Sequence, residues 1–383
     1  MSREYYRTYG FNELALSLAS NMSYRKATAF LNRVRWETDN GTPMRTFAHL
    51  IETEGQQVQE TLNDMTESVL TQNQFDKDGI PKQEAEITTG LAPKEASLPA
   101  ERITEAIEHY NQGKTEEFHI DAVAANQLYE NPKVTVNVSI DDVGVKKQKE
   151  TGRSPAKHRK EKREYVHNTI AHVEKENQSY VLNGSSTPHV LKLLIAFLLY
   201  NNLIAGHHLL FFVDGARSLH ACLINMFKWL PHVGIVLDWY HLKKKCEYEL
   251  SLVLNGSKVR NALLEQLLPL LWLGKVNDAI TLLRQIHPEK MKAGQSVDRL
   301  VGYFERNRDY IPCYALRKQL GLRNSSNKGE KANDLCVADR QKHNGMSWSK
   351  PGSVALASVI SLHLNNEQDF WCSKYTLSFT WAA

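Results

Sequence analysis

Three stretches of the chain end an apolar run with an aspartate. LLFFVD ends at Asp214, GIVLD ends at Asp238, and KVTVNVSIDD ends at Asp141 and Asp142. Continuous or alternating apolar runs of this length are typical of buried strands. Strands that end in acids at one edge of a sheet would bring their carboxylates together. Such carboxylates repel each other unless a cation neutralises them, and oxygen ligands suit Mg²⁺ or Mn²⁺.

A further carboxylate would complete such a metal site, and Glu330 is the best candidate. It opens a predicted helix directly after the polar turn RNSSNKG. Three carboxylates that hold two ions can support phosphoryl transfer, because the ions activate a water and stabilise the leaving oxygen. The alternative is that Glu330 only stabilises the positive end of its own helix.

The order of predicted elements from residue 133 onward is three strands, a helix, a strand, a helix and a strand. Three antiparallel strands continued by a βαβ unit form a mixed α/β sheet covered by helices. With the first strand central, the fourth lies beside it, so that Asp141 and Asp214 become neighbours. The pattern is helical throughout residues 242–321, which predicts an all-helical insertion.

The first 65 residues predict a short helix, a turn, a helix, a loop and a third helix that starts at Thr42 and Pro43. This is the outline of a helix-turn-helix module, and a small bundle used for oligomerisation is the alternative. The predicted boundaries are a helical DNA-binding region (1–65), a linker (66–132), the first part of the core (133–241), the insertion (242–321), the last part of the core with the Glu330 helix (322–371) and a tail (372–383).

The positive charge of the chain is concentrated in one segment. The net charge is +4, yet residues 146–164 hold nine Lys or Arg against three Glu. A basic loop on a nearly neutral body is typical of a protein with a polyanionic partner, and a solvated surface loop is the alternative. The residues expected to contact DNA phosphate there are Lys157, Arg159, Lys160, Lys162 and Arg163.

Composition favours a soluble cytoplasmic protein. The five cysteines form no CxxC pair, which argues against a zinc ribbon or a disulfide framework. The opening residues are charged where a signal peptide needs an apolar stretch. The most apolar segment is interrupted by Lys192, Asn201 and Asn202, so no membrane span is expected.

Several of these motifs together resemble those of the DDE transposases. The acids Asp141, Asp214 and Glu330, the DWYH element from Asp238 to His241, and the helical insertion before the glutamate carry the likeness. The resemblance is greatest to bacterial insertion-sequence transposases related to the Mutator group, which have a C/DxxH motif between the second and third acids. DGAR, LDWYH, RNSSNKGEKAND and QKHNGMSWS are similar to signature segments of that group. The likeness covers roughly residues 130–370.

The resemblance implies a ribonuclease H-like fold and an enzyme that moves DNA. Asp141, Asp214 and Glu330 would be catalytic and hold two Mg²⁺ or Mn²⁺ ions, with Asp142 as an alternative first acid. The partners would be terminal inverted repeats and target DNA, bound by a homo-oligomer. Asp238 and His241 would support the site by orienting DNA or a metal-bound water, unless Asp238 only caps a helix into which His241 packs.

Two further DNA contacts are expected, together with two rival functions. Lys243 and Lys244 would face phosphate, and Trp348 would stack on an extruded base unless it is a core residue. The first rival is a stand-alone nuclease of the same fold, which cleaves DNA without joining it. The second is a non-catalytic DNA-binding protein derived from a transposase, against which the presence of all three acids argues.

Overall fold

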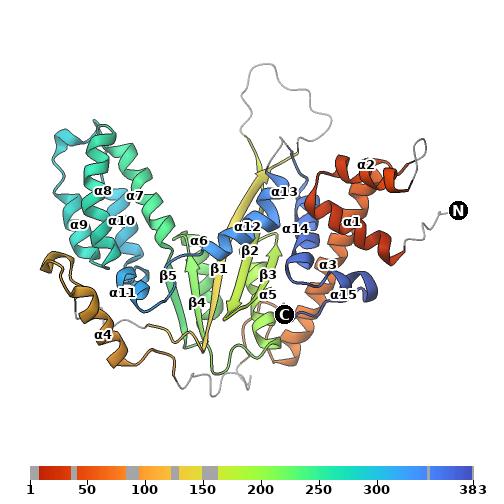
Figure 1. Cartoon of the computed structure of the whole chain (residues 1–383), viewed down its shortest axis with the longest axis horizontal. Coiled ribbons are helices and arrows are strands. Elements are labelled where there is room, and N and C mark those ends of the chain that lie inside the picture. The colour runs from red at the N-terminus through yellow and green to blue at the C-terminus, as the bar shows by residue number, and fades with distance from the viewer. Residues whose placement is uncertain are drawn as a thin grey trace.

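A five-stranded mixed sheet forms the centre of the molecule (Figure 1). The structure is a computed structural model that describes residues 8–35, 41–82, 95–121, 129–148, 163–342 and 346–381. The strands are β1 (Thr135–Lys146), β2 (Tyr165–Lys175), β3 (Gln178–Gly184), β4 (His208–Val213) and β5 (Val233–Leu237). Their order in the sheet is β3-β2-β1-β4-β5. The pairs β3/β2 and β2/β1 are antiparallel, and the pairs β1/β4 and β4/β5 are parallel. The predicted mixed sheet, with the first strand beside the fourth, is confirmed.

The residue types of the strands explain where each one lies. All six residues of β4 are buried, as expected for a parallel strand covered by helices on both faces. In β1 the first six residues are buried except Asn137, and in the second half buried Val143 and Val145 alternate with less buried residues. The sheet therefore has a parallel half with continuous apolar strands and an antiparallel half with more polar ones.

The parallel register sets three aspartates at one level. Ser139 pairs with Phe212, and Val213 pairs with Leu237. Two residues further along the first register, Asp141 is opposite Asp214, and one residue further along the second, Asp214 is opposite Asp238. Neighbouring strands lie about 4.8 Å apart. The prediction that β1 ends at Asp141 and Asp142 is wrong, because β1 continues to Lys146 as the partner of β2. Only its parallel part stops near the aspartate.

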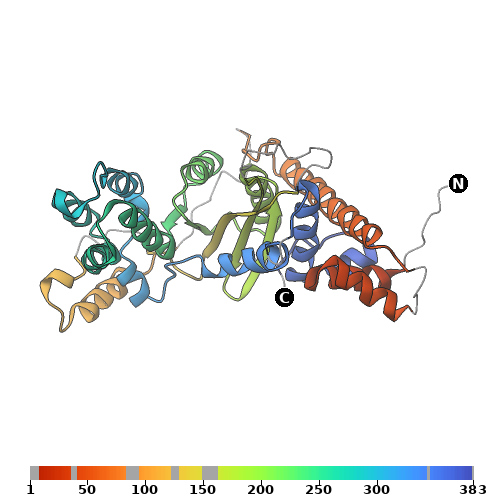
Figure 2. The ribbon, with the colours of Figure 1, turned by 90° about the horizontal axis from the view of Figure 1, so that it is seen from above.

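Helices cover both faces of the sheet (Figure 2). α5 (Thr187–Tyr200) and α6 (Arg217–Phe227) lie on one face, and α12 (Asn327–Asn333) crosses the other. A π-helical turn, Asp334–Ala338, joins α12 to α13 (Asp339–Gln341) without a break. Single π-helical turns inside helices often occur at functional sites.

The N-terminal helices belong to the main core. They are α1 (Tyr9–Asn21), α2 (Tyr24–Val34) and α3 (Met44–Gln72), so α3 crosses the boundary expected at residue 65. The side chains of Thr8 and Ser23 cap the first two helices, each through a backbone N–H of the first turn. The Gln59 amide donates a hydrogen bond of 2.7 Å to Ser358 Oγ, and buried Leu16, Leu31 and Phe47 share one apolar cluster with the sheet. These helices are therefore not a separate module attached by a loose linker.

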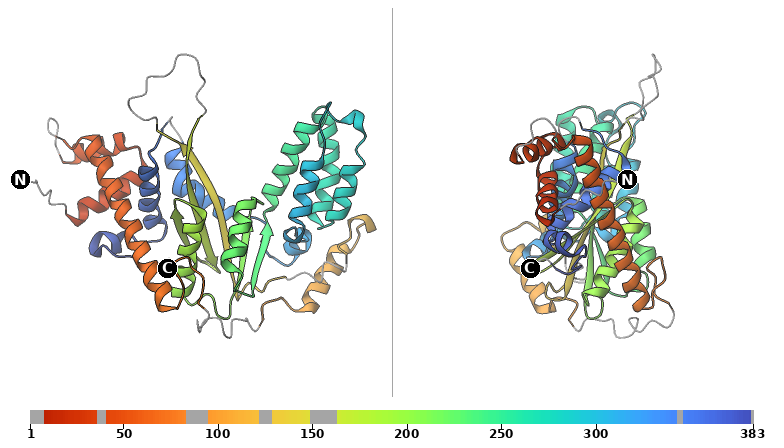
Figure 3. Two further views of the ribbon diagram at one scale, coloured as in Figure 1. Left: turned by 180° about the vertical axis from the view of Figure 1, so that it is seen from behind. Right: turned by 90° about the vertical axis from the view of Figure 1, so that its right-hand side faces the viewer.

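The predicted helical insertion has its own apolar core at the other end of the sheet (Figure 3). It begins directly after β5 and gives the molecule the outline of a V, with α7 on the inner side of its arm. The Tyr303 hydroxyl donates to the carbonyl oxygen of Asp214 (3.1 Å), and the Tyr314 hydroxyl donates to that of Leu237 (2.7 Å). Its helices are α7 (Trp239–Val253), α8 (Ser257–Trp272), α9 (Val276–Arg284), α10 (Asp298–Arg306) and α11 (Tyr314–Gln319), with short 3-10 turns at Pro288–Lys290 and Arg308–Tyr310.

The segment expected to be a linker packs against the insertion. It contains α4 (Ala100–Asn111) and a 3-10 turn, Glu116–Phe118, and α4 shares a small apolar cluster with α11. The buried guanidinium of Arg317 forms a two-pronged ion pair with buried Glu130, with N···O distances of 2.7 and 2.6 Å. Arg317 also donates to the carbonyl oxygen of Arg323, where the chain returns to the sheet.

The C-terminal segment completes the main core. It contains α14 (Lys350–Leu364) and α15 (Gln368–Lys374). Phe379 is fully buried in the tail, and its backbone N–H donates to buried Glu367. The Phe379 ring thus packs against Phe197 of α5. Among the described residues, no helix combines the length and the apolar character that a membrane crossing requires.

Arg317→Leu should lower the free energy of unfolding by about 3–5 kcal/mol, because it leaves the buried Glu130 carboxylate without a partner. Arg284→Leu is the matched control, since it breaks an exposed pair with Glu305 and should cost less than about 1 kcal/mol. Urea denaturation of the two variants measures both values. Equal losses would show that the buried pair does not anchor the insertion.

Candidate active site

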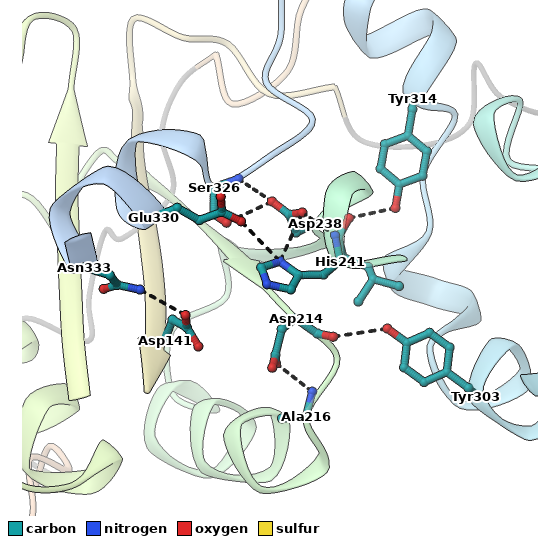
Figure 4. A network of polar contacts seen from close by, with 11 residues as sticks. Asp141, Asp214, Ala216, Asp238, His241, Tyr303, Tyr314, Ser326, Glu330 and Asn333 are labelled. Atoms are coloured by element: carbon teal, nitrogen blue, oxygen red, sulfur yellow. Dashed lines mark hydrogen bonds and ion pairs between the residues drawn. The ribbon is translucent and has the colours of Figure 1, made fainter. Parts of the chain in front are cut away.

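Three carboxylates from three separate elements line one small hollow at the C-terminal end of the parallel strands (Figure 4). Asp141 comes from β1, Asp214 follows β4, and Glu330 lies on α12. His241, Ser326 and Asn333 line the same hollow. The structure thus brings together the three acids that the sequence singled out, across an interval of 189 residues from first to last.

Asp141, and not Asp142, faces this hollow. Its Oδ1 accepts the backbone N–H of Asp142 (2.8 Å), and its Oδ2 accepts the Asn333 side-chain amide (3.0 Å). Burial raises the pKa of the Asp141 carboxyl, and the negative charge of Asp214 adds to the rise. Asp142 is exposed and instead accepts a hydrogen bond from the Thr169 hydroxyl on β2.

The DGAR turn holds Asp214 at the end of its strand. Asp214 Oδ1 accepts the backbone N–H of Ala216 at 2.8 Å. Gly215 has a φ of +84°, a conformation that other residues rarely adopt, and a Cβ there would lie 2.5 Å from the Tyr303 hydroxyl. The close contact with Tyr303 of α10 means that the insertion helps to fix this turn.

Glu330 reaches the site because its helix lies very close to β1. A Cβ on the preceding Gly329 would lie 2.4 Å from Cβ of Ser139. The Glu330 side chain is 35% exposed and points toward His241 (Figure 4). Burial raises the pKa of Glu330, His241 opposes the rise, and the charges of Asp238 and Asp141 add to it. The glutamate is in the first turn of α12, so a favourable interaction with the helix dipole exists as well.

Asp238 connects the end of β5 to the start of the Glu330 helix. Its Oδ1 caps α7 by accepting the backbone N–H of His241 at 2.9 Å. Its Oδ2 accepts both the backbone N–H and the hydroxyl of Ser326. Burial alone would raise the pKa of Asp238, but the hydrogen bonds from His241 and Ser326 lower it overall. The capping alternative is therefore correct for Asp238, and the same carboxylate also fixes the turn before α12.

His241 lies between two acids. Its Nδ1 is 3.2 Å from Asp238 Oδ1 and 3.8 Å from Glu330 Oε1. Contact with Asp238 raises the pKa of His241, although burial opposes the rise. Asp238, His241 and Glu330 have ligand atoms within 4.8 Å of one another. Asp238 is fully buried and its two oxygens accept three hydrogen bonds, whereas Asp141 accepts two and Asp214 one. We therefore regard Asp141 and Asp214 as better partners of Glu330 for an ion.

The expected DNA contacts have different positions. Lys243, Lys244 and Arg163 are exposed, the two lysines on α7. Trp348 is buried, and its indole N–H donates to the carbonyl oxygen of Gln341 (3.1 Å), so it is the core residue of the alternative prediction. Four expected phosphate contacts lie outside the described residues: Lys157, Arg159, Lys160 and Lys162.

Sequence reasoning missed Asn333 and Ser326. Asn333 is three residues after Glu330, which puts both side chains on the same side of a helix. That spacing could have identified it. The tyrosines that hold the strand ends, Tyr303 and Tyr314, have no comparable signal in the sequence, because they come from the insertion.

Comparison of the chain with protein-family models, with curated proteins and with solved structures gives no match. The function must therefore be argued from the geometry of the site.

Asp238→Ala should lower the free energy of unfolding by at least about 3 kcal/mol, because it removes a helix cap and leaves two half-buried donors of Ser326 unpaired. Ser326→Ala, which removes only one hydroxyl donor, should cost about 1 kcal/mol. Thermal unfolding measures stability, and hydrogen exchange should show faster exchange at residues 322–330 in Asp238→Ala. Protection equal to wild type there would contradict the role given to Asp238.

Proposed function

We propose that the protein is a DNA transposase of the DDE type. It cleaves one strand at each end of a mobile element and joins the freed 3′ end to target DNA by phosphoryl transfer. The observation that carries the proposal is the convergence of Asp141, Asp214 and Glu330 from two strands and a helix into one hollow. A non-catalytic DNA-binding protein would have no need of this arrangement.

The donor set suits divalent cations with oxygen ligands. Asp141, Asp214 and Glu330 supply only carboxylate oxygens, which favours Mg²⁺ or Mn²⁺ over Zn²⁺. Of the two Asp214 oxygens, Oδ1 accepts a hydrogen bond from Ala216, and each Asp141 oxygen accepts one, so lone pairs are left for ions. When bound, two such ions activate the attacking oxygen and stabilise the leaving oxygen.

The other residues of the site orient these carboxylates. Asn333 fixes the rotation of the Asp141 carboxylate by donating to Oδ2. Asp238 and Ser326 fix the start of the helix that presents Glu330. His241 stands beside Glu330 and, when protonated, adds a positive charge next to the acid. Fixed carboxylates of this kind can position the attacking and leaving oxygens in line for phosphoryl transfer.

The sheet supports a ribonuclease H-like identity for the core. Its central β1 pairs antiparallel with β2 and parallel with β4, as the resemblance to DDE transposases implies. We further propose that the N-terminal helices form the helix-turn-helix-like region that recognises element ends, and that the protein acts on DNA as a homo-oligomer in the cytoplasm. The exposed face of α2 carries the positive residues Arg25, Lys26 and Arg33.

Asp214→Asn should reduce nicking of a labelled element end by about a thousandfold in Mg²⁺, because the site then holds too little negative charge for two ions. Asp141→Asn and Glu330→Gln should behave alike, and double variants should be little worse, since the residues act as a unit. Asp142→Asn is the matched control and should nick nearly as wild type does. Wild-type nicking by both Asp214→Asn and Glu330→Gln would overturn the mechanism.

Two further measurements accompany that assay. Mg²⁺ should raise the thermal unfolding midpoint of the wild type but not of Asp214→Asn, which without metal should be at least as stable because like charges no longer oppose each other. Strand transfer of a pre-cut end to a plasmid distinguishes a transposase from a stand-alone nuclease. Cleavage without any joining would favour the stand-alone nuclease over the transposase.

Replacing Arg25, Lys26 and Arg33 of α2 by Gln should reduce the preference for element ends over random duplex at least about tenfold, because contacts to base edges specify sequence. A gel-shift competition, with ends taken from inverted repeats that flank the gene, measures this preference. Lys228→Gln with Lys374→Gln, which removes two exposed positive charges elsewhere, is the control for a general loss of charge. Deleting the helices is unsuitable, because they share the main core. An unchanged preference would place recognition elsewhere.

A further inference from the structure

α7 presents an unusual row of exposed side chains. Tyr240, Tyr248 and Leu252 are 41%, 61% and 41% exposed, and Lys244 lies between the two tyrosines. The four residues are spaced four apart, so they form one strip about 18 Å long on the surface of the helix. The opposite face of α7 packs into the core of the insertion through Leu242, Cys246, Leu250 and Val253.

The strip starts at the candidate active site. The rings of Tyr240 and His241 lie 5.8 Å apart between centroids, and His241 contacts Glu330. From there it runs along α7, the helix on the inner side of the V (Figure 1). It is therefore continuous with the site and leads away from the three carboxylates.

The charges of the strip favour an anionic occupant. The ammonium of Lys244 lies 4.1 Å from the centre of the Tyr240 ring, which leaves it at the surface beside an aromatic face. Lys243 is also exposed, at one side of the strip. Its ammonium is 3.9 Å from the Glu247 carboxylate and therefore offsets the negative charge of that residue. Aromatic faces interleaved with lysines are the pattern that binds a nucleic-acid strand, since bases stack on the rings and the phosphates approach the ammonium groups.

We propose that Tyr240, Lys244, Tyr248 and Leu252 bind an unpaired DNA strand next to the phosphate that is cut. The bases of a duplex already stack on each other, so only unpaired bases can offer their faces to the tyrosine rings. The proposal rests on the proposed DNA cleavage for its location. It adds a substrate feature to that function, namely local unpairing of the strand beside the scissile phosphate.

Binding of fluorescein-labelled oligothymidylate to the full-length protein in EDTA tests the strip without requiring catalysis. Tyr248→Ala should bind it roughly tenfold more weakly, because stacking on an aromatic ring is lost, while Tyr248→Phe should bind as wild type does. Fully paired duplex of the same length should be affected much less. Lys244→Gln should instead lower the salt dependence of binding, by somewhat under one unit of slope. Tyr200→Ala removes another exposed tyrosine (47%) from a different helix, α5, and should not change binding.

The outcomes separate this inference from the proposed function. If the wild type nicks DNA in Mg²⁺ and Tyr248→Ala binds oligothymidylate normally, the strip does not bind unpaired DNA. The proposed transposase function would then still stand. Loss of oligothymidylate binding in Tyr248→Ala, with a wild type that nicks no DNA, would support the strip and refute the nuclease chemistry. Equal losses on paired and unpaired DNA, or a change of oligomeric state in Tyr248→Ala, would overturn the strip, since duplex or a second copy would then be its occupant.

Discussion

The parallel register of β1, β4 and β5 is the constraint on which the rest of the site depends. It puts Asp141, Asp214 and Asp238 at one level of neighbouring strands. Two ionised carboxylates about 5 Å apart repel each other by about 3 kcal/mol at an effective dielectric constant of 20. The fold deals with each acid differently: Asp238 is buried and fully hydrogen-bonded, Asp141 is held by Asn333, and Asp214 keeps unshared oxygen capacity. A site of this kind is arranged to receive positive charge.

Glu330 reaches those acids because the chain, after the helical insertion, returns to the end of β5 from which it left. The insertion leaves the sheet after Asp238, and the returning turn is bound to the departing one by a hydrogen bond of 3.0 Å from the Trp239 N–H to the carbonyl oxygen of Asn324. Buried Glu174 on β2 pairs with Arg323 and Lys328 on either side of this turn. Because the insertion is compact and has its own core, its length adds little entropy cost to closing the loop.

The two ends of the chain serve the same core. Trp371 of α15 donates its indole N–H to buried Glu54 of α3, and Arg340 of α13 donates to the carbonyl oxygen of Ala19 in α1. Any ligand held on the exposed side of α2 would thus lie at a set position relative to the carboxylates. A rigid link of this kind matters for a proposed transposase, since recognition of an element end must deliver one particular phosphate to the site.

The sequence by itself determined the elements and the candidate acids, because apolar periodicity and residue type are local properties. β4, β5, the helical insertion and the residues Asp141, Asp214 and Glu330 all follow from such patterns. Only the tertiary structure decided which of Asp141 and Asp142 faces the site, since that depends on the pairing of β1 with β2 and β4. It also decided that Trp348 is a core residue, that α3 belongs to the main core, and that Tyr303 and Tyr314 hold the strand ends. Those facts arise from contacts between segments far apart in the chain, and a local sequence pattern carries no information about such contacts.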